Sequence, residues 1–226
     1  SKMNFVTKWG SKGDGNEQFN RPTAVTVDGN GNVYVVDALN DCIKEFDSSG
    51  KFMLKCGSYG SKNGQFDYPT RMAIDKNGNI YVGSNDSVQK FDSKGKYITK
   101  FGNHGTETGQ FNGINGIAID KKENIYVAEG TFERIQKFDS MGNFISKWGG
   151  KEESKFKNID AITMDNAGNI YVLGYNDIQK FDKNMEAAGV WFDFDGETIG
   201  ELGGIATDNE GNIYVTELHY DFSAVV

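Results

Sequence analysis

One sequence pattern recurs five times along the chain. Each copy reads Asp-x-x-x-Asn-Ile/Val-Tyr-Val, and the copies begin at Asp28, Asp75, Asp120, Asp165 and Asp208. The tyrosines of successive copies are 47, 45, 45 and 43 residues apart. Self-similarity at a fixed period is the sequence signature of a repeat architecture. The fold must therefore be assembled from one supersecondary unit of this length, used about five times.

Each copy is predicted to contain four short strands. In the first copy these are residues 23–28, 33–37, 42–47 and 51–56, rich in β-branched and aromatic residues and separated by Asp-Gly, Asn-Gly or Ser-Gly turns. Three further features recur with the pattern four times each: a Phe upstream, a Phe-Asp pair at the end of the third strand, and Lys-x-Gly at the end of the fourth, where x is aromatic except at Cys56. No segment shows a long helical period. Four strands in a period of this length are typical of a β-propeller blade.

The repeat predicts a single domain, residues 1–226, with five four-stranded blades. Their boundaries are about 19–57, 66–102, 111–149, 156–193 and 199–226. Residues 4–10 match the fourth strand of a blade, whereas the last copy offers only three strands, the third at 222–226. We therefore predict that the N-terminal strand completes the last blade, which closes the ring and removes open sheet edges.

The repeat resembles the NHL repeat. The likeness lies in Gly-x-Phe, Pro, Ile/Val-Ala-x-Asp, Gly-Asn-Ile-Tyr-Val and Ile-Gln-Lys-Phe-Asp, and is clearest in residues 64–92 and 109–139. Propellers of that family more often have six blades, and the Asn-His-Leu triplet is replaced here, in the first copy, by residues 37–41, Asp-Ala-Leu-Asn-Asp. The resemblance implies a binding scaffold and no single reaction, since NHL-like propellers include protein binders, RNA binders, sensors and a few enzymes.

The composition and charge of the chain restrict the classes of partner that it is expected to bind. The chain has 226 residues with 24 Lys plus Arg and 32 Asp plus Glu, a net charge of −8, which disfavours a general nucleic-acid binder. No apolar run approaches the roughly 20 residues of a membrane helix, and no signal peptide is visible. We expect a monomer without a membrane span. A secreted or cell-surface location is favoured over a cytoplasmic one.

Residues that occur in every copy are interpreted as structural. The Asp-x-x-Gly-Asn unit could form a calcium loop. With Asp28 as position 1, however, the sixth and twelfth positions are Val33 and Leu39 instead of the required Gly and acidic residue, so a hairpin turn is favoured. The repeated tyrosines are expected to pack between blades. The repeated lysines are expected on outer strands, where they discourage edge-to-edge pairing; they are Lys8, Lys55, Lys100 and Lys147.

The two cysteines lie in the third and fourth strands of the first copy. A hairpin register in which Phe46 faces Phe52 would place Cys42 opposite Cys56. A cross-strand disulfide is then one alternative, for an exported protein, and two buried reduced thiols are the other.

Residues that break the repeat are the better site candidates. In propellers the first strand of each blade lines the central channel, and the loops before the first strand and after the second share the face where ligands usually bind. The candidates at this channel mouth are Asp37, Arg71, Asn115, Glu129, Asp160, Tyr175, Glu217 and His219. They would form an acidic funnel with one Arg and a few aromatics.

The function favoured by these patterns is a non-enzymatic binding module for a protein, peptide or glycan. No residue is assigned a catalytic role, because no Ser/His/Asp or Cys/His arrangement stands out. No cofactor is expected to be required, although the acidic residues leave a divalent cation such as Ca²⁺ open. The alternative is a metal-dependent lyase or hydrolase with its site in the acidic funnel; RNA binding would need a basic face.

Overall fold

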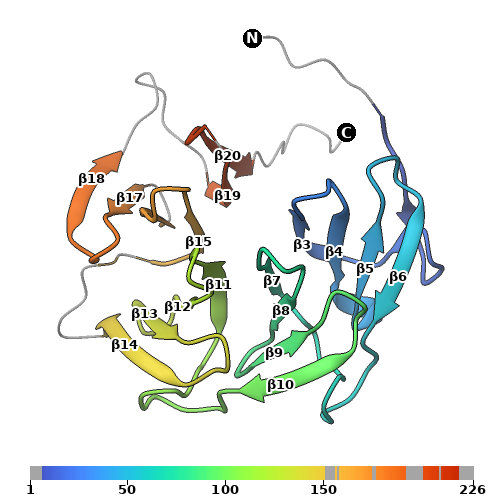
Figure 1. Ribbon diagram of the computed structural model, residues 1–226, viewed down its shortest axis with the longest axis horizontal. Helices are drawn as coiled ribbons and strands as arrows, with labels where there is room; N and C mark the ends of the chain where they lie inside the picture. The colour runs from blue at the N-terminus through green and yellow to red at the C-terminus, as the bar shows by residue number, and fades with distance from the viewer. Residues whose placement is uncertain are drawn as a thin grey trace, which may run out of the picture. The chain divides into compact units, whose positions relative to one another are not determined.

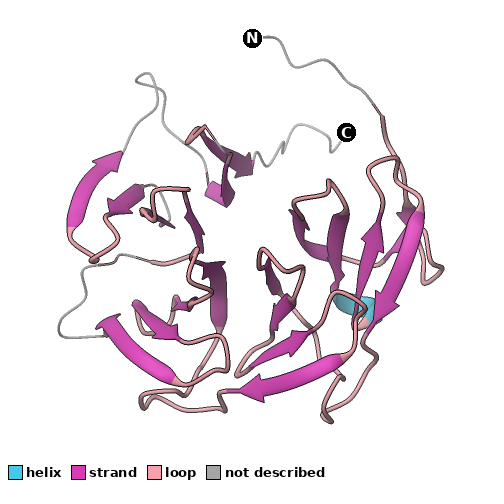
Figure 2. Cartoon of the chain, in the orientation of Figure 1, coloured by secondary structure: helices cyan, strands magenta, loops and turns pink. Residues whose placement is uncertain are grey.

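The computed structural model describes residues 7–150, 156, 158–174, 177–191, 201–208 and 210–218, with the backbone alone at 191, 201, 202, 217 and 218. Regular structure in this part of the chain is almost entirely β-strand (Figure 2), and its one helix is a three-residue 3-10 helix, Ala38–Asn40. No helix among these residues is long and apolar enough to cross a bilayer. The chain divides into two compact units, Ser1–Ser84 with Gln89–Ile98, and Asn85–Val88 with Thr99–Val226.

Four four-stranded sheets follow one another along the chain, and in each sheet the strands lie in sequence order (Figure 1). The sheets comprise β3 (Pro22–Val27), β4 (Val33–Asp37), β5 (Cys42–Phe46) and β6 (Phe52–Cys56); β7 (Arg71–Ile74), β8 (Ile80–Gly83), β9 (Val88–Phe91) and β10 (Tyr97–Phe101); β11 (Ile114–Ile119), β12 (Ile125–Glu129), β13 (Arg134–Phe138) and β14 (Phe144–Gly149); and β15 (Ala161–Met164), β16 (Ile170–Leu173), β17 (Ile178–Phe181) and β18 (Ala187–Trp191). Each of these sheets has the four strands that the repeat predicts for one blade.

The described residues contain four four-stranded blades rather than the predicted five. The fifth copy forms a two-stranded antiparallel sheet of β19 (Glu201–Thr207) and β20 (Ile213–Leu218). The expected third strand at 222–226 and residues 4–6 of the expected closing strand lie outside the described residues, and residues 7–10 have no strand pairing.

The turn between the first two strands of each blade is built on the repeated Asp. Asp28 Oδ1 accepts hydrogen bonds from the backbone N–H groups of Asn30 (2.8 Å) and Asn32 (2.9 Å), and Gly31 has φ +84°. The same contacts recur at Asp75, Asp120, Asp165 and Asp208. The hairpin-turn interpretation is confirmed, since the carboxylate oxygens bind their own turn.

The core lies between consecutive blades. Tyr34 and Val36 of β4 are buried in one cluster with Met72 of β7, within the first unit. Tyr126 of β12 is buried with Ile162 of β15, within the second unit. The expected interblade packing of the repeated tyrosines is confirmed for these blades, and burial of this apolar area is the main source of stability.

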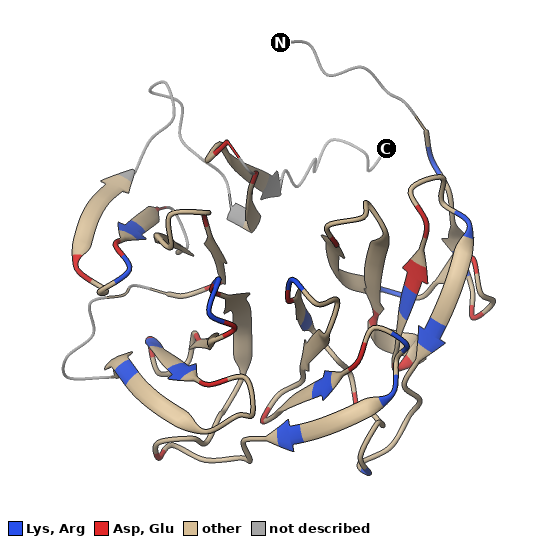
Figure 3. Ribbon diagram, in the orientation of Figure 1, with Lys and Arg blue, Asp and Glu red and all other residues tan. Residues whose placement is uncertain are grey.

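The last strand of a blade is a sheet edge. Lys55, Lys100 and Lys147 are exposed on β6, β10 and β14, and each is the single basic residue of its strand (Figure 3). Charged edge strands resist pairing with another chain, as predicted.

Candidate functional site

The loop that leads into each of the first three blades has one design. In the first, β1 (Ser11–Lys12) pairs in parallel with β2 (Gln18–Phe19). Parallel bridges join Tyr59 to Phe66 and His104 to Phe111 at the equivalent places. Inside each loop a glutamine oxygen accepts a backbone N–H, for example Gln18 Oε1 from Gly15 at 3.2 Å. These loops are therefore fixed structures rather than loose connections.

A polar side chain from the middle of the third strand anchors each loop to its own blade. Gln89 Nε2 donates to the carbonyl of Gln65 at 2.6 Å and its Oε1 accepts the N–H of Gly64 at 2.8 Å. Gln136 makes the same pair of bonds, to Gln110 and Gly109, at 2.9 Å each. Both glutamines are buried. Each of these loops is thus held in place by a buried glutamine of its own sheet.

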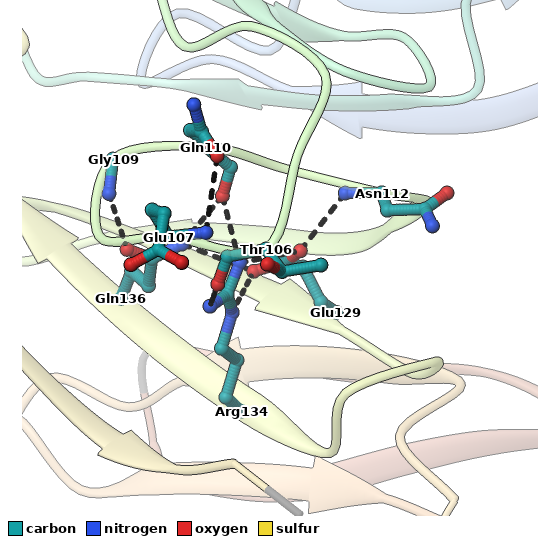
Figure 4. A network of polar contacts seen from close by, with 8 residues as sticks. All are labelled: Thr106, Glu107, Gly109, Gln110, Asn112, Glu129, Arg134 and Gln136. Atoms are coloured by element: carbon teal, nitrogen blue, oxygen red, sulfur yellow. Dashed lines mark hydrogen bonds and ion pairs between the residues drawn. The ribbon is translucent and has the colours of Figure 1, made fainter.

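In the third blade this anchor is extended by a buried ion pair (Figure 4). Glu129, the last residue of β12, is fully buried and binds Arg134, with Arg134 Nε 2.5 Å from Glu129 Oε2. Glu129 also accepts the backbone N–H of Asn112 at 3.0 Å and Gln136 Nε2 at 3.0 Å. Arg134 in turn donates to the carbonyls of Thr106 and Gln110. The carboxylate is therefore satisfied on every side within its own blade.

The first blade contains an equivalent buried ion pair, but its cation stands at a different position of the third strand. Asp37 occupies the position of Glu129 and accepts the N–H of Asn20 at 2.7 Å. Its cation is Lys44, with Nζ 2.8 Å from Asp37 Oδ2, and both side chains are fully buried. Lys44 also donates to the carbonyls of Gly15 and Gln18. Asp37 and Glu129, which the sequence predicts as ligand residues, therefore direct their oxygens to partners inside the blade.

Two further candidates lie close together in the second unit. Asn115 of β11 donates from Nδ2 to the carbonyl of Ile159 at 2.9 Å, directly before Asp160 at the start of the next blade. Asp160 is half-buried, and its own N–H bonds the carbonyl of Leu173 at 2.8 Å. Thr23 makes the contact equivalent to that of Asn115, to the carbonyl of Pro69, in the first unit. The side chain at this position therefore mainly links one blade to the next through a hydrogen bond.

Of the four remaining candidates, the structure describes Arg71 fully and Glu217 by its backbone alone. Arg71 begins β7, is half-buried and donates to the carbonyl of Thr70 at 3.1 Å. Glu217 lies in β20 with its backbone opposite Leu202. Tyr175 and His219 lie outside the described residues. Within the described residues no three His, Cys, Asp or Glu side chains are grouped as metal ligands.

Sequence reasoning missed the partners of the acidic residues. Lys44 stands where the other three complete blades have Gln89, Gln136 and Gln179, and Arg134 stands where the first blade has Cys42. Both residues break the repeat in a strand rather than in a loop. A comparison of the third strands across copies would have shown that each acidic residue has a cation in its own blade.

The register predicted for the cysteines is wrong by one residue. Ile43, not Cys42, lies opposite Cys56, because the ladder shifts between Glu45 and Phe46. A bulge of this kind places one extra residue in one strand and moves every later pairing. Both cysteines are buried free thiols, and the disulfide alternative stays a prediction.

The thiols should be unreactive in the folded protein. Burial raises the pKa of Cys42 to about 11 and that of Cys56 to about 12, so neither forms the reactive thiolate near neutral pH. We expect almost no reaction with a disulfide reagent at about pH 8 and rapid reaction of both thiols after unfolding in guanidinium without reductant. An absence of titratable thiol in the unfolded, unreduced chain would establish the disulfide instead.

Glu45 replaces a repeated lysine beneath the blade tyrosine. In three blades the lysine Nζ lies over the ring, at 4.9 Å for Lys90–Tyr81, 4.8 Å for Lys137–Tyr126 and 5.4 Å for Lys180–Tyr171. In the first blade the Tyr34 hydroxyl instead donates to Glu45 Oε1 at 2.9 Å. Burial raises the pKa of the Glu45 carboxyl, so its ionised form is disfavoured in the folded state.

The substitution E45K should therefore stabilise the protein by about 1 kcal/mol near pH 7. A raised folded-state pKa contributes stability that is complete below the ordinary Glu pKa and is lost as the pH rises through the raised value. The advantage of E45K should consequently grow between about pH 4 and pH 7 in urea unfolding. The reverse change K137E should destabilise; a pH-independent E45K effect would contradict this explanation.

Comparisons with known proteins identify the fold. No protein-family model and no curated protein matches the chain. A streptogramin B lyase superposes with a TM-score of 0.64 at 16% identity, over 87% of this chain and 62% of that one. A gluconolactonase from Xanthomonas campestris gives 0.64 at 14%, over 87% and 69%. A set of WD40 repeats gives 0.60 at 12%, over 76% and 51%.

These similarities concern architecture alone at such identities. The chain spans about three fifths of the length of the lyase. The solved structures that it resembles include both enzymes and WD40 repeats, so the shared fold does not select one activity. The NHL resemblance stays a prediction from the repeat. The chain has the fold of an all-β propeller.

Proposed function

We propose that this chain is a non-enzymatic propeller binding module that presents its loop face to a protein, peptide or glycan. The observation that supports the proposal is the use of Asp37 and Glu129 inside their blades. Each carboxylate is fully buried, paired with a cation and bonded to a backbone N–H of the loop. Acidic residues used in this way hold a rigid display surface, and such surfaces bind with little ordering cost. The similarity to WD40 repeats agrees with an interaction role.

The test is calorimetry with Ca²⁺, Mg²⁺ and Mn²⁺ at millimolar concentrations. The binding-module proposal, which needs no cofactor, predicts no saturable heat with any of the three. Saturable binding that is lost in D160N would contradict it. Asn158→Ala, a change at an exposed position two residues away, provides the control.

The second candidate is a metal-dependent lyase or hydrolase. It is favoured by the positions of Asn115 and Asp160 at the starts of two consecutive blades, where the Asn115 amide bonds the carbonyl of the residue before Asp160. The lyase and the gluconolactonase among similar structures agree with this candidate. Metal binding at Asp160, followed by metal-dependent turnover of a lactone or a glycan, would establish it.

We also propose that the chain forms five blades, with its N-terminal strand completing the last one. Trp9 supports this. Its ring is 3.1 Å from where a Cβ of Gly50 would lie. At the equivalent glycines, Phe101 is 2.6 Å from a Cβ of Gly142, and Cys56 is 2.9 Å from a Cβ of Gly95. Trp9 thus packs against the first blade as the fourth strand of a preceding blade does. Val25 is 67% exposed, whereas its equivalents Met72, Ile117 and Ile162 are at most 9% exposed.

Closure of this kind predicts a monodisperse 25 kDa monomer in light scattering. Closure predicts that Val25 is shielded from solvent in solution, so V25D should cause association or unfolding. The control V190D changes a valine on the edge strand β18 that is 44% exposed. A wild-type chain that associates at micromolar concentration would contradict five-bladed closure.

A further inference from the structure

Arg21 and Tyr68 occupy one equivalent position in two consecutive blades. Each is the second residue after the loop phenylalanine, Phe19 or Phe66. Their φ angles are +56° and +57°, in the left-handed region. Residues with large side chains adopt this conformation rarely and at a cost in free energy.

The fold does not require a large side chain at this position. Gly113 stands there in the third blade with φ +87°, and the exposed Asn158 stands there in the fourth with φ +49°. Glycine and asparagine are the residues best suited to such a backbone. Arg21 and Tyr68 are therefore the less stable choice for the backbone, which points to a role for their side chains.

The two side chains form a stacked pair in the first unit. Arg21 Cζ lies 5.5 Å from the centroid of the Tyr68 ring. The backbone N–H of Tyr68 is fixed by Asp41 Oδ1 at 2.9 Å. The carbonyl of Arg21 accepts the N–H of Ala38 at 3.3 Å. The pair is thus pre-organised by two contacts from the segment between β4 and β5 of the first blade.

An exposed apolar residue lies beside this pair. Leu39, in the 3-10 helix Ala38–Asn40, is 50% exposed, and its N–H bonds the carbonyl of Asn20 at 3.1 Å. That bond places Leu39 next to the residue preceding Arg21. We call Arg21, Leu39 and Tyr68 the recognition patch. It combines a cation, an aromatic ring and an aliphatic side chain on the loop face.

The guanidinium of Arg21 is exposed and makes no hydrogen bond to any residue in the described part of the chain. A planar guanidinium held on an aromatic ring presents paired N–H donors that match a carboxylate. We propose that the recognition patch binds a peptide segment in which an Asp or Glu stands next to an apolar residue. The carboxylate would bind Arg21, and the apolar side chain would pack on Leu39 and Tyr68. This proposal rests on the proposed binding function and names its ligand class.

The test uses a phage-displayed library of random seven-residue peptides, selected in parallel on the intact wild type, R21G and N158G. We expect wild type and N158G to enrich an acidic residue beside an apolar one, and R21G to enrich it at least 10-fold less. R21G and N158G should both keep or raise the melting temperature, because glycine relieves the left-handed strain at each position. Loss of enrichment in R21G is then separated from loss of folding.

Equal enrichment on R21G, or no preference for acidic peptides on the wild type, would overturn the proposal. Displacement of a selected peptide from the wild type by an oligosaccharide containing uronate, with tighter binding of the sugar, would also overturn it in favour of an acidic glycan. Peptides that bind equally well to R21G would refute the patch and leave the binding function standing. Saturable metal binding at Asp160 would instead refute the binding function itself.

Discussion

Replacement of Glu129 by alanine is expected to lower the free energy of unfolding by about 3–5 kcal/mol, a large part of the stability of a domain. The variant leaves Arg134 buried without its counter-charge and the backbone N–H of Asn112 without an acceptor. Removal of one partner of a buried ion pair is far more costly than removal of both. Urea unfolding followed by circular dichroism measures the loss.

Two further variants test the cause. Glu107 lies in the loop anchored by this network and is exposed, so E107A should change stability by no more than about 0.5 kcal/mol. The double variant E129L/R134M removes both charges and should recover most of the stability lost in E129A. If E129A were as stable as E107A, the ion pair would contribute nothing to holding the loop.

Replacement of Lys44 by glutamine is the second large expected effect, a loss of about 3 kcal/mol. Asp37 would remain fully buried without a cation, and one of the bonds to the carbonyls of Gly15 and Gln18 would be lost. The matched control is K55Q, because Lys55 pairs with Lys44 across the ladder and is exposed. K55Q should be nearly neutral, and equal stabilities for the two variants would contradict the prediction.

The third blade suggests how to rescue K44Q. There the acid is Glu129, the cation is Arg134, and glutamine occupies the position of Lys44. The triple variant D37E/C42R/K44Q reproduces that arrangement in the first blade and should be more stable than K44Q. A triple variant no more stable than K44Q would show that the two networks depend on their different blades.

The four-stranded blade could be predicted from the sequence because the contacts that form it join residues of a single copy. Its strands and turns follow from the Asp turn and the alternation of apolar residues within one copy, and Asp28 and Tyr34 behave as the repeat predicts. Such features need only contacts a few residues apart. The blade count was less accessible, since it depends on the ends of the chain, where the copies are incomplete.

The partners of the candidate site residues could not be predicted from the sequence, and the reason is physical. Asp37 and Glu129 stand at loop positions where a ligand would bind, but the direction of a carboxylate is set by the cations available to it. Those cations lie in the third strand, at Lys44 and Arg134. Conversely, Arg21 and Tyr68 look ordinary in the sequence, and their unusual backbone becomes visible only in φ.

The anchoring of each entry loop by the third strand of its own blade bears on how the chain folds. The contacts Gly64–Gln89 and Gly109–Gln136 close loops of 25 and 27 residues. Short closures have a low entropic cost and favour rapid folding. Each blade can therefore nucleate alone and recruit its neighbour afterwards. Amide hydrogen exchange should accordingly show separate protected segments, each about one repeat long, that open at different free energies.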